Sequence, residues 1–383
     1  MSVTAARGFL AGGVAAGIKE SGDRDLALVV NRGPSRAAAG VFTSNRVQAA
    51  PVRWSRRVLA DGRISAVVLN SGGANACTGE PGAVDARLMA EHTARAVDVD
   101  PHEVAVCSTG LIGVRLPMDR VTAGIATAGD LLSPEGGEDA AVAIKTTDSV
   151  HKTAVVSGPG WTVGGMAKGA GMLAPGLATM LVVLTTDADA SAAVLDSTLR
   201  AAVRTTFDRV DSDGCMSTND TVLLLASGAS GVVPDLESFT EAVHAVCLDL
   251  ARQLVADAEG ASKEIEVTVV GAASEDDAVE VGRSVARNNL LKCALHGEDP
   301  NWGRVLSAIG TTSAAFDPDR LDVAVNDVWV CRNGAAGESR DKVDLSGRRI
   351  TVTVDLRSGE SCAVIWTNDL TAEYVHENSA YSS

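Results

Sequence analysis

The sequence predicts an α/β protein. Short apolar segments typical of β-strands alternate with alanine-rich segments typical of helices along the whole chain. Of the 383 residues, 46% are hydrophobic but only 3% are aromatic, so the core is built mostly from Ala, Val and Leu side chains. A chain of this length indicates two domains or one large α/β body.

The first half of the chain follows this alternation. Residues 26–30 and 64–69 are apolar runs bounded by glycine and polar residues, which predicts two strands. Apolar residues at three- and four-residue spacing predict a helix over 84–97. A further strand at 104–107 leads directly into the turn sequence STGLIG.

The second half continues the same pattern. Strands are predicted at 179–186, 221–226 and 265–271, helices at 191–207, 236–260 and from near Glu275, and two final β-rich segments, RITVTVDL and CAVIWT. The candidate boundaries between domains are the loop before Thr179 and a glycine after the long helix, near Gly260 or Gly271.

Charge and cysteine usage exclude several classes of protein. The formal net charge of −16 argues against a nucleic-acid partner or an anionic membrane surface, because both require a Lys/Arg-rich face. No apolar run approaches the roughly 20 residues of a membrane-spanning helix. The seven cysteines are scattered without a C-x-x-C pair, and the six histidines show no metal-ligand spacing. We therefore expect a cytoplasmic protein with reduced thiols and no metal.

Several glycine-rich or polar segments have a structural interpretation. Neither GGVAAGIK (12–19) nor GGMAKGAG (164–171) matches a phosphate-binding loop, so their glycines are interpreted as turns and sites of close backbone approach. NSGGANACTG (70–79) could line a site or be an ordinary loop. DSDGCMSTNDT (211–221) lacks the final Glu of a calcium-binding loop and is interpreted as a turn-rich loop.

One further polar segment comes before a predicted helix, and another comes after a predicted strand. In HGEDPNWGR, Asp299 is expected to start a helix that contains Trp302 and Arg304. In STGLIG, Thr109 and Gly110 follow a buried strand, where a hydroxyl and a backbone N–H could stabilise an oxyanion. From the residues alone, an ordinary polar turn is the alternative.

The segment KGAGMLAPGLATML (168–181) ends in the junction between a loop and a strand. Thr179 is an ordinary residue to open a strand, but three local features favour a self-cleaving peptide bond. Lys168 is expected on a Gly-rich turn, Pro175 and Gly176 can hold the chain in an unusual backbone state, and Ala178 leaves its carbonyl carbon unshielded.

These features suit an N→O acyl shift at the junction. The hydroxyl of Thr179 attacks the carbonyl carbon of Ala178, and water hydrolyses the resulting ester. Cleavage leaves an α-amine on the nucleophile's own residue, with an intrinsic pKa near ~8 that burial would lower. A threonine activated by its own terminal amine needs no histidine or aspartate relay.

With STGLIG upstream, DAEG and HGEDPNWGR downstream and a terminal ENSAYSS, the chain resembles the bacterial ornithine acetyltransferases. These are self-processing glutamate N-acetyltransferases of arginine biosynthesis. The resemblance covers essentially the whole chain. It implies an α/β sandwich similar to that of the self-cleaving aminopeptidases, distinct from the standard N-terminal-nucleophile hydrolase fold, and a reaction without a cofactor.

The resemblance also implies a role for particular residues. Cleavage between Ala178 and Thr179 would give an α chain (1–178) and a β chain (179–383) with Thr179 as nucleophile. Thr109 and Gly110 match the oxyanion hole. The substrate-binding residues are Thr146 (in preference to Thr147), Lys168 for the α-carboxylate, Thr179, Glu259 for the ornithine amine or a proton, and the terminal Asn378 and Ser382. The chain departs from the usual family pattern only at Thr147-Asp148-Ser149 and at Glu298.

The implied reaction is a ping-pong transfer of acetyl from N²-acetyl-L-ornithine to L-glutamate, in a tetramer of two α and two β chains. Whether acetyl-CoA also serves as donor stays open. The alternatives are an aminopeptidase or amidohydrolase with water as acceptor, a paralogue from a specialised pathway, and an uncleaved binding protein.

Overall fold

The computed structural model describes residues 2–174 and 180–380, and these residues form two compact units. The first unit consists of the chain up to Asp208 together with Cys215–Asp257, and the second of Arg209–Gly214 together with the chain from Ala258 onward. Within the described ranges, no helix is both long enough and apolar enough to cross a membrane.

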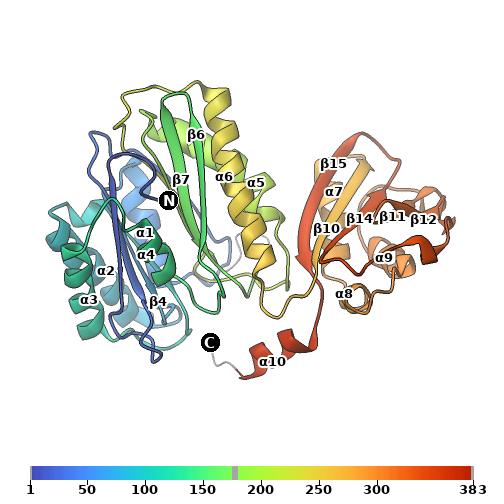
Figure 1. Cartoon of the computed structure of the whole chain (residues 1–383), viewed down its shortest axis with the longest axis horizontal. Coiled ribbons are helices and arrows are strands. Elements are labelled where there is room, and N and C mark those ends of the chain that lie inside the picture. The colour runs from blue at the N-terminus through green and yellow to red at the C-terminus, as the bar shows by residue number, and fades with distance from the viewer. Residues whose placement is uncertain (1, 175–179, 381–383) are drawn as a thin grey trace. The chain divides into compact units, whose positions relative to one another are not determined.

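Two sheets form the centre of the first unit (Figure 1). In the described residues, the first sheet has the order β1 (Phe9–Val14), β2 (Leu26–Asn31), β4 (Ala66–Ser71), β5 (Val104–Thr109). The second sheet has the order β3 (Ala38–Phe42), β9 (Thr221–Ala226), β8 (Leu181–Thr186), β7 (Trp161–Lys168), β6 (Lys152–Gly158).

The described helices of the first unit are α1 (Ala50–Val58), α2 (Gly79–Val97), α3 (Met118–Asp130), α4 (Gly137–Ala143), α5 (Ala192–Thr205) and α6 (Leu236–Ala256). The unit has helices on the outer faces of the sheets, and α4 contributes to the core between them. Helices α2 and α3 pack on the first sheet, and α5 and α6 on the second (Figure 1).

Alternating side chains of the strands explain the layers. In β2, Ala27 and Val29 face the core between the two sheets, whereas Leu26, Leu28 and Val30 pack toward α2 and α3. Because successive side chains of a strand point to opposite faces, this alternation determines which layer each face of the strand packs against. The first unit is therefore a four-layered α/β sandwich, which confirms the fold class expected from the sequence.

The second sheet combines strands from both sides of residue 179. β8 and β9, which follow that residue, pair in parallel, and they lie between β3 on one side and β7 and β6 on the other. β7 and β8 are antiparallel, with Lys168 opposite Leu181 in the register. The end of β7 is thus held beside the start of β8.

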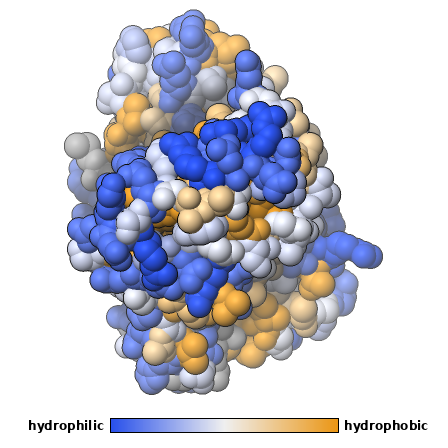
Figure 2. Space-filling view, turned by 90° about the vertical axis from the view of Figure 1, so that its right-hand side faces the viewer, coloured by the Kyte–Doolittle hydropathy of each residue, from blue (hydrophilic) through white to orange (hydrophobic). Residues whose placement is uncertain are grey.

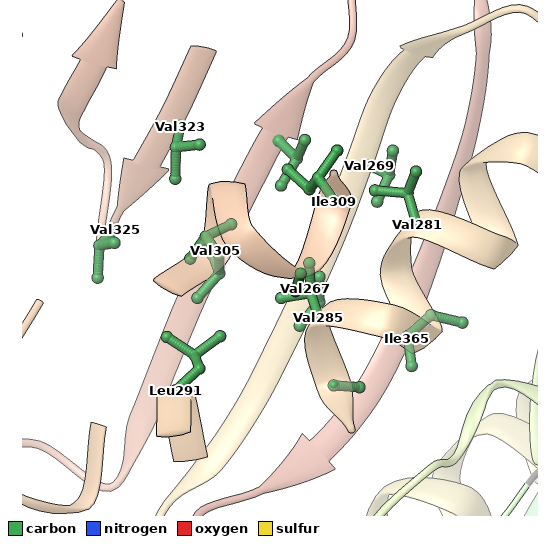
Figure 3. Close-up of a cluster of buried hydrophobic side chains, with 14 of the residues drawn as sticks. Val267, Val269, Val281, Val285, Leu291, Val305, Ile309, Val323, Val325 and Ile365 are labelled. Carbon is green, nitrogen blue, oxygen red and sulfur yellow. The ribbon is translucent and has the colours of Figure 1, made fainter. Parts of the chain in front are cut away.

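The second unit contains, within the described residues, a six-stranded mixed sheet. Its order is β13 (Ala335–Ala336), β12 (Val328–Arg332), β11 (Asp322–Val325), β14 (Arg349–Asp355), β10 (Glu264–Ala272), β15 (Ser361–Asn368). The helices of this unit are α7 (Glu275–Ala286), α8 (Asn289–His296), α9 (Trp302–Ile309) and α10 (Ala372–Ala380). Val267 and Val269 of β10 pack against Val281 and Val285 of α7 (Figure 3).

On the face drawn in Figure 2, hydrophilic residues predominate and hydrophobic residues gather in smaller groups. This distribution fits a chain of which 21% of the residues are charged.

Two details of the predicted elements were wrong. The long helix ends at Ala256, not at Gly260: Asp257 is its C-cap residue and leaves the helical conformation, with φ −107° and ψ 19°. Asp299 does not start the helix of Trp302: α9 begins after Asn301, without a side-chain cap. The Asp299 carboxylate instead accepts hydrogen bonds from Arg340 (2.7 Å) and Asn301 (3.0 Å).

Candidate active site

The turn that follows β5 is fixed by its backbone. The carbonyl of Thr109 accepts hydrogen bonds from the N–H groups of both Gly72 and Gly73, each at 2.9 Å. Gly110 has a φ of 127°, and a Cβ at this position would lie 2.5 Å from the backbone nitrogen of Gly73. Only glycine fits both the dihedral angle and the space. The two residues expected to form an oxyanion hole therefore lie on a rigid turn.

Lys168 brings a buried positive charge to this turn. Its side chain is 1% exposed, and its Nζ donates a hydrogen bond to Oγ1 of Thr109 at 3.2 Å. The expectation that Lys168 lies on a Gly-rich turn was wrong, because it is the last residue of β7. The glycines before it serve close approach within the strand: a Cβ on Gly164 would lie 2.4 Å from the carbonyl oxygen of Ser2.

A buried carboxylate balances the charge of Lys168. Burial alone would raise the pKa of Asp148, but the ammonium groups of Lys168 and Lys152 outweigh this and lower the pKa to about 2. Asp148 Oδ1 accepts hydrogen bonds from Lys152 Nζ (2.6 Å) and from the N–H of Gly169 (2.7 Å). Lys152 also donates to Asp257, at 2.5 Å. This network anchors the chain on both sides of Lys168.

Thr146 is tied to the same network. It is half-buried, and its backbone N–H donates to Oδ2 of Asp148 at 3.0 Å. The carboxylate of Asp148 therefore connects the segment of Thr146 with the end of β7. Two of the residues that the resemblance assigns to substrate binding share one buried anion.

Asp220 lies next to the start of β8. Its Oδ1 accepts a hydrogen bond from the N–H of Met180 at 3.0 Å, and in the described part of the chain no donor reaches its Oδ2 in hydrogen-bonding geometry. Burial raises the pKa of Asp220 well above its usual range, and the Met180 N–H, the nearby Ser217 hydroxyl and Lys168 oppose this only in part.

The neighbouring Asn219 joins this segment to the Thr109 turn. Its amide donates to the carbonyls of Ala74 (2.6 Å) and Ser108 (2.8 Å). The sequence pattern predicts only a turn-rich loop here and misses both Asn219 and Asp220. The signal that could have identified them is the run of polar residues directly before the fully buried strand TVLLLA.

The predicted site residues fall into two groups. Thr109, Gly110, Thr146 and Lys168 belong to the first unit and are brought together as described above. Glu259 and Asn378 belong to the second unit, where the amide of Asn378 on α10 donates to Oε2 of Glu259 at 3.0 Å. Ala178, Thr179 and Ser382 lie outside the described residues.

The arrangement in the first unit suits anion chemistry. A rigid backbone turn, a threonine hydroxyl and a buried ammonium meet at one point, which is how proteins stabilise a carboxylate or a developing oxyanion. Across the described ranges, no group of three or more His, Cys, Asp or Glu side chains could hold a metal ion.

The sandwich is that of an α/β protein, and the turn beside Lys168 is a candidate anion-binding site. The chain belongs to the ArgJ family, whose model matches residues 10–383. This membership confirms the relation that the motifs indicated.

Two relatives are similar to this chain over its full length. The arginine biosynthesis bifunctional protein ArgJ of Streptomyces avermitilis is 71% identical over 383 residues, covering 100% of both chains. The protein of the same name from Thermobifida fusca is 61% identical, again covering 100% of both. Among solved structures, ornithine acetyltransferase complexed with ornithine from Mycobacterium tuberculosis is 55% identical, covering 47% of this chain and 96% of that chain, with a TM-score of 0.45.

Proposed function

We propose that this chain transfers the acetyl group of N²-acetyl-L-ornithine to L-glutamate, with Thr179 as the nucleophile. The relatives are named as bifunctional proteins of arginine biosynthesis, and a 55% identical chain is an ornithine acetyltransferase. The observation that carries the proposal in this structure is the contact of Lys168 with Thr109, directly beside the start of β8.

The nucleophile arises by self-cleavage. The Thr179 hydroxyl attacks the carbonyl carbon of Ala178, the C–N bond breaks, and water hydrolyses the ester to release the carboxylate of Ala178 and a free α-amine on Thr179. Asp220 supports this step by holding the N–H of the next residue, Met180. The products are an α chain of residues 1–178 and a β chain of residues 179–383.

The first half-reaction transfers acetyl to the enzyme. The Thr179 oxygen attacks the acetyl carbonyl of acetylornithine, and its proton passes to the Thr179 α-amine. The oxyanion of the tetrahedral intermediate is stabilised by Thr109 and Gly110. The amide C–N bond then breaks, and ornithine leaves with the proton that the α-ammonium returns.

The second half-reaction reverses these roles. The neutral α-amine of glutamate attacks the acetyl ester, the ester C–O bond breaks, and Thr179 regains its proton through its α-amine. Both substrates carry an α-carboxylate, which Lys168 pairs with. Thr146, Glu259, Asn378 and Ser382 complete the binding of the substrates. No cofactor takes part in this scheme, and the enzyme works in the cytoplasm as a tetramer of two α and two β chains.

An assay of the purified protein tests the function. Acetylornithine with glutamate should give ornithine and N-acetylglutamate in equal amounts. Free acetate formed from acetylornithine without glutamate would identify the amidohydrolase alternative instead. Acetyl-CoA with glutamate, in a second assay, decides whether the chain has one acetyl donor or two.

Replacing Thr179 by alanine should abolish both scission and transfer, because the same hydroxyl performs both. We expect the rate to fall by at least about 10³-fold and mass spectrometry to show one polypeptide of 383 residues. The matched control is Thr127→Ala on the exposed face of α3, which should be cleaved and active. A processed and active Thr179→Ala protein would refute the assignment.

A further inference from the structure

The peptide group between Lys145 and Thr146, in the first unit, is held at both of its polar atoms. Its N–H, which belongs to Thr146, donates to Oδ2 of Asp148 at 3.0 Å. Its carbonyl, which belongs to Lys145, accepts a hydrogen bond from Nζ of Lys19 at 2.8 Å. Because a peptide group is planar, two hydrogen bonds at its opposite edges fix the orientation of the plane. The N–Cα bond of Thr146 lies in that plane, so the same two contacts fix the position of its Cα atom.

Lys19 is itself held in place by the backbone around it. Its N–H and that of Ile18 donate to Oδ2 of Asp25, at 3.0 and 2.6 Å. Asp25 is fully buried and directly precedes β2. The Nζ of Lys19 also donates to the carbonyl of Arg24 at 3.0 Å. The ammonium group therefore reaches Lys145 from an anchored segment of the chain.

The methylene chain of Lys19 lies beside the turn that contains Thr109. A Cβ on Gly72 would lie 3.3 Å from Cγ of Lys19, and the N–H of Gly72 donates to the carbonyl of Thr109 at 2.9 Å. Lys19 therefore connects two parts of the candidate site: its stem packs beside the Thr109 turn, and its ammonium binds the segment of Thr146.

The two contacts of this peptide group come from opposite charges. An ammonium binds the carbonyl oxygen and a carboxylate binds the N–H, so each charge meets the end of the peptide dipole that it stabilises. Burial lowers the pKa of Lys19. Three nearby carboxylates oppose this shift, those of Asp25, Asp23 and Asp148. Loss of the ammonium would leave the peptide group held at its N–H alone.

We propose that Lys19 is a positioning residue for substrate binding, which acts by fixing the peptide group that precedes Thr146. The inference rests on the proposed function, in which Thr146 contacts the substrate. Lys19 needs no contact with the substrate for this role, because its ammonium acts through the carbonyl of Lys145. Its loss weakens substrate binding and leaves the acyl-transfer step nearly unchanged.

Lys19→Met tests this role, because methionine keeps an unbranched apolar stem beside Gly72 and removes the ammonium. The KM values for acetylornithine and for glutamate should both rise about 10-fold, as expected for the loss of a hydrogen bond to a charged group. The kcat value should change by less than about 2-fold, because the lost interaction is the same in the ground state and the transition state. Lys19→Arg, which keeps the charge and the donor, should recover most of the binding.

A double-mutant cycle with Thr146→Ala identifies the route of the effect. If Lys19 acts through Thr146, Lys19→Met should change the KM values by less than about 2-fold in a chain that already carries Thr146→Ala. The control variant is Lys342→Met, an exposed lysine of the second unit, which should behave as the unaltered protein. Circular dichroism of each variant shows that the kinetic constants are compared among folded chains.

The possible outcomes are distinct. If the unaltered protein forms no ornithine from acetylornithine and glutamate, the proposed function fails. If transfer occurs but Lys19→Met leaves both KM values unchanged, or raises them equally with and without Thr146→Ala, the role of Lys19 is overturned while the function stands. A Thr146→Ala variant with unaltered KM values overturns it in the same way.

Discussion

In the first unit, the buried ammonium of Lys152 lies 2.6 and 2.5 Å from two carboxylates, whereas in the second unit the buried ammonium of Lys292 contacts a carbonyl and a hydroxyl. The first arrangement is complete, and its charges hold the chain around Lys168 in place. The second lacks a counter-ion among the described residues and lines a cavity. The comparison separates a buried ammonium that is paired with carboxylates from one whose hydrogen-bond partners are neutral.

The difference between Lys152 and Lys292 is tested most directly by the free energy of unfolding of variants that lack each lysine. Lys152→Met leaves Asp148 and Asp257 without their shared cation, so we expect a loss of about 3–5 kcal/mol in the free energy of unfolding. Lys292→Met leaves two neutral acceptors unpaired and should cost less, about 1–3 kcal/mol. Urea unfolding followed by circular dichroism measures both.

The matched control removes an exposed pair. Arg200→Ala breaks a contact with Asp196 on the surface of α5 and should change stability by less than about 1 kcal/mol. Equal losses for Lys152→Met and Lys292→Met would contradict the distinction between the two lysines.

The pH dependence of stability should have opposite signs in the two units. The pKa of Asp148 is lowered from 3.8 to about 2, so its stabilisation is complete above pH 4 and is lost as the pH falls toward 2. Burial raises the pKa of Asp211, in the second unit, from 3.8 to about 6, with Arg287 opposing. Its contribution is complete below pH 4 and is lost as the pH rises toward 6. Each amounts to ~2–3 kcal/mol.

Unfolding measured at several pH values checks these signs. Asp211→Asn should remove the slope between pH 4 and 6, and Asp148→Asn the slope between pH 4 and 2. A stability that is flat with pH in the unaltered protein would argue against both assignments.

The smallest predicted change concerns the turn after β5. Gly110→Ala should destabilise the first unit by about 1–3 kcal/mol and slow transfer, because the new Cβ would meet the backbone of Gly73. Gly113 has a φ of 82°, and a Cβ added there would have no described atom within 4 Å, so Gly113→Ala adds only backbone strain of about 1 kcal/mol. Thermal unfolding and initial rates compare the two variants, and equal effects would show that the turn is not fixed by contact with Gly73.

Local patterns were sufficient to predict most of the fold. The period-two strand at 265–271 is observed as β10, and the helix at 191–207 as α5. Each is determined by residues close together in the chain. The left-handed φ of Gly110 is likewise consistent with the glycine that follows a strand in STGLIG.

The charged groups of the site could not be predicted in the same way. Asp148 meets Lys152 through a four-residue separation, but Asp257, the second anion that contacts Lys152, is 105 residues away from it in sequence. Asp220 contacts Met180 across 40 residues. Whether a lysine such as Lys292 is buried with or without a counter-ion depends on contacts made only in the folded chain.

The interleaving of strands in the second sheet of the first unit bears on when the proposed cut can happen. The part before residue 179 supplies β3 at one edge and β7 and β6 at the other, and the part after it supplies the two strands between them. Neither part alone supplies all the strands of this sheet, and among the described strands β3 pairs only with β9 of the other part. The proposed cut would therefore come after folding of the intact chain, and two parts made separately would have to associate in a concentration-dependent step.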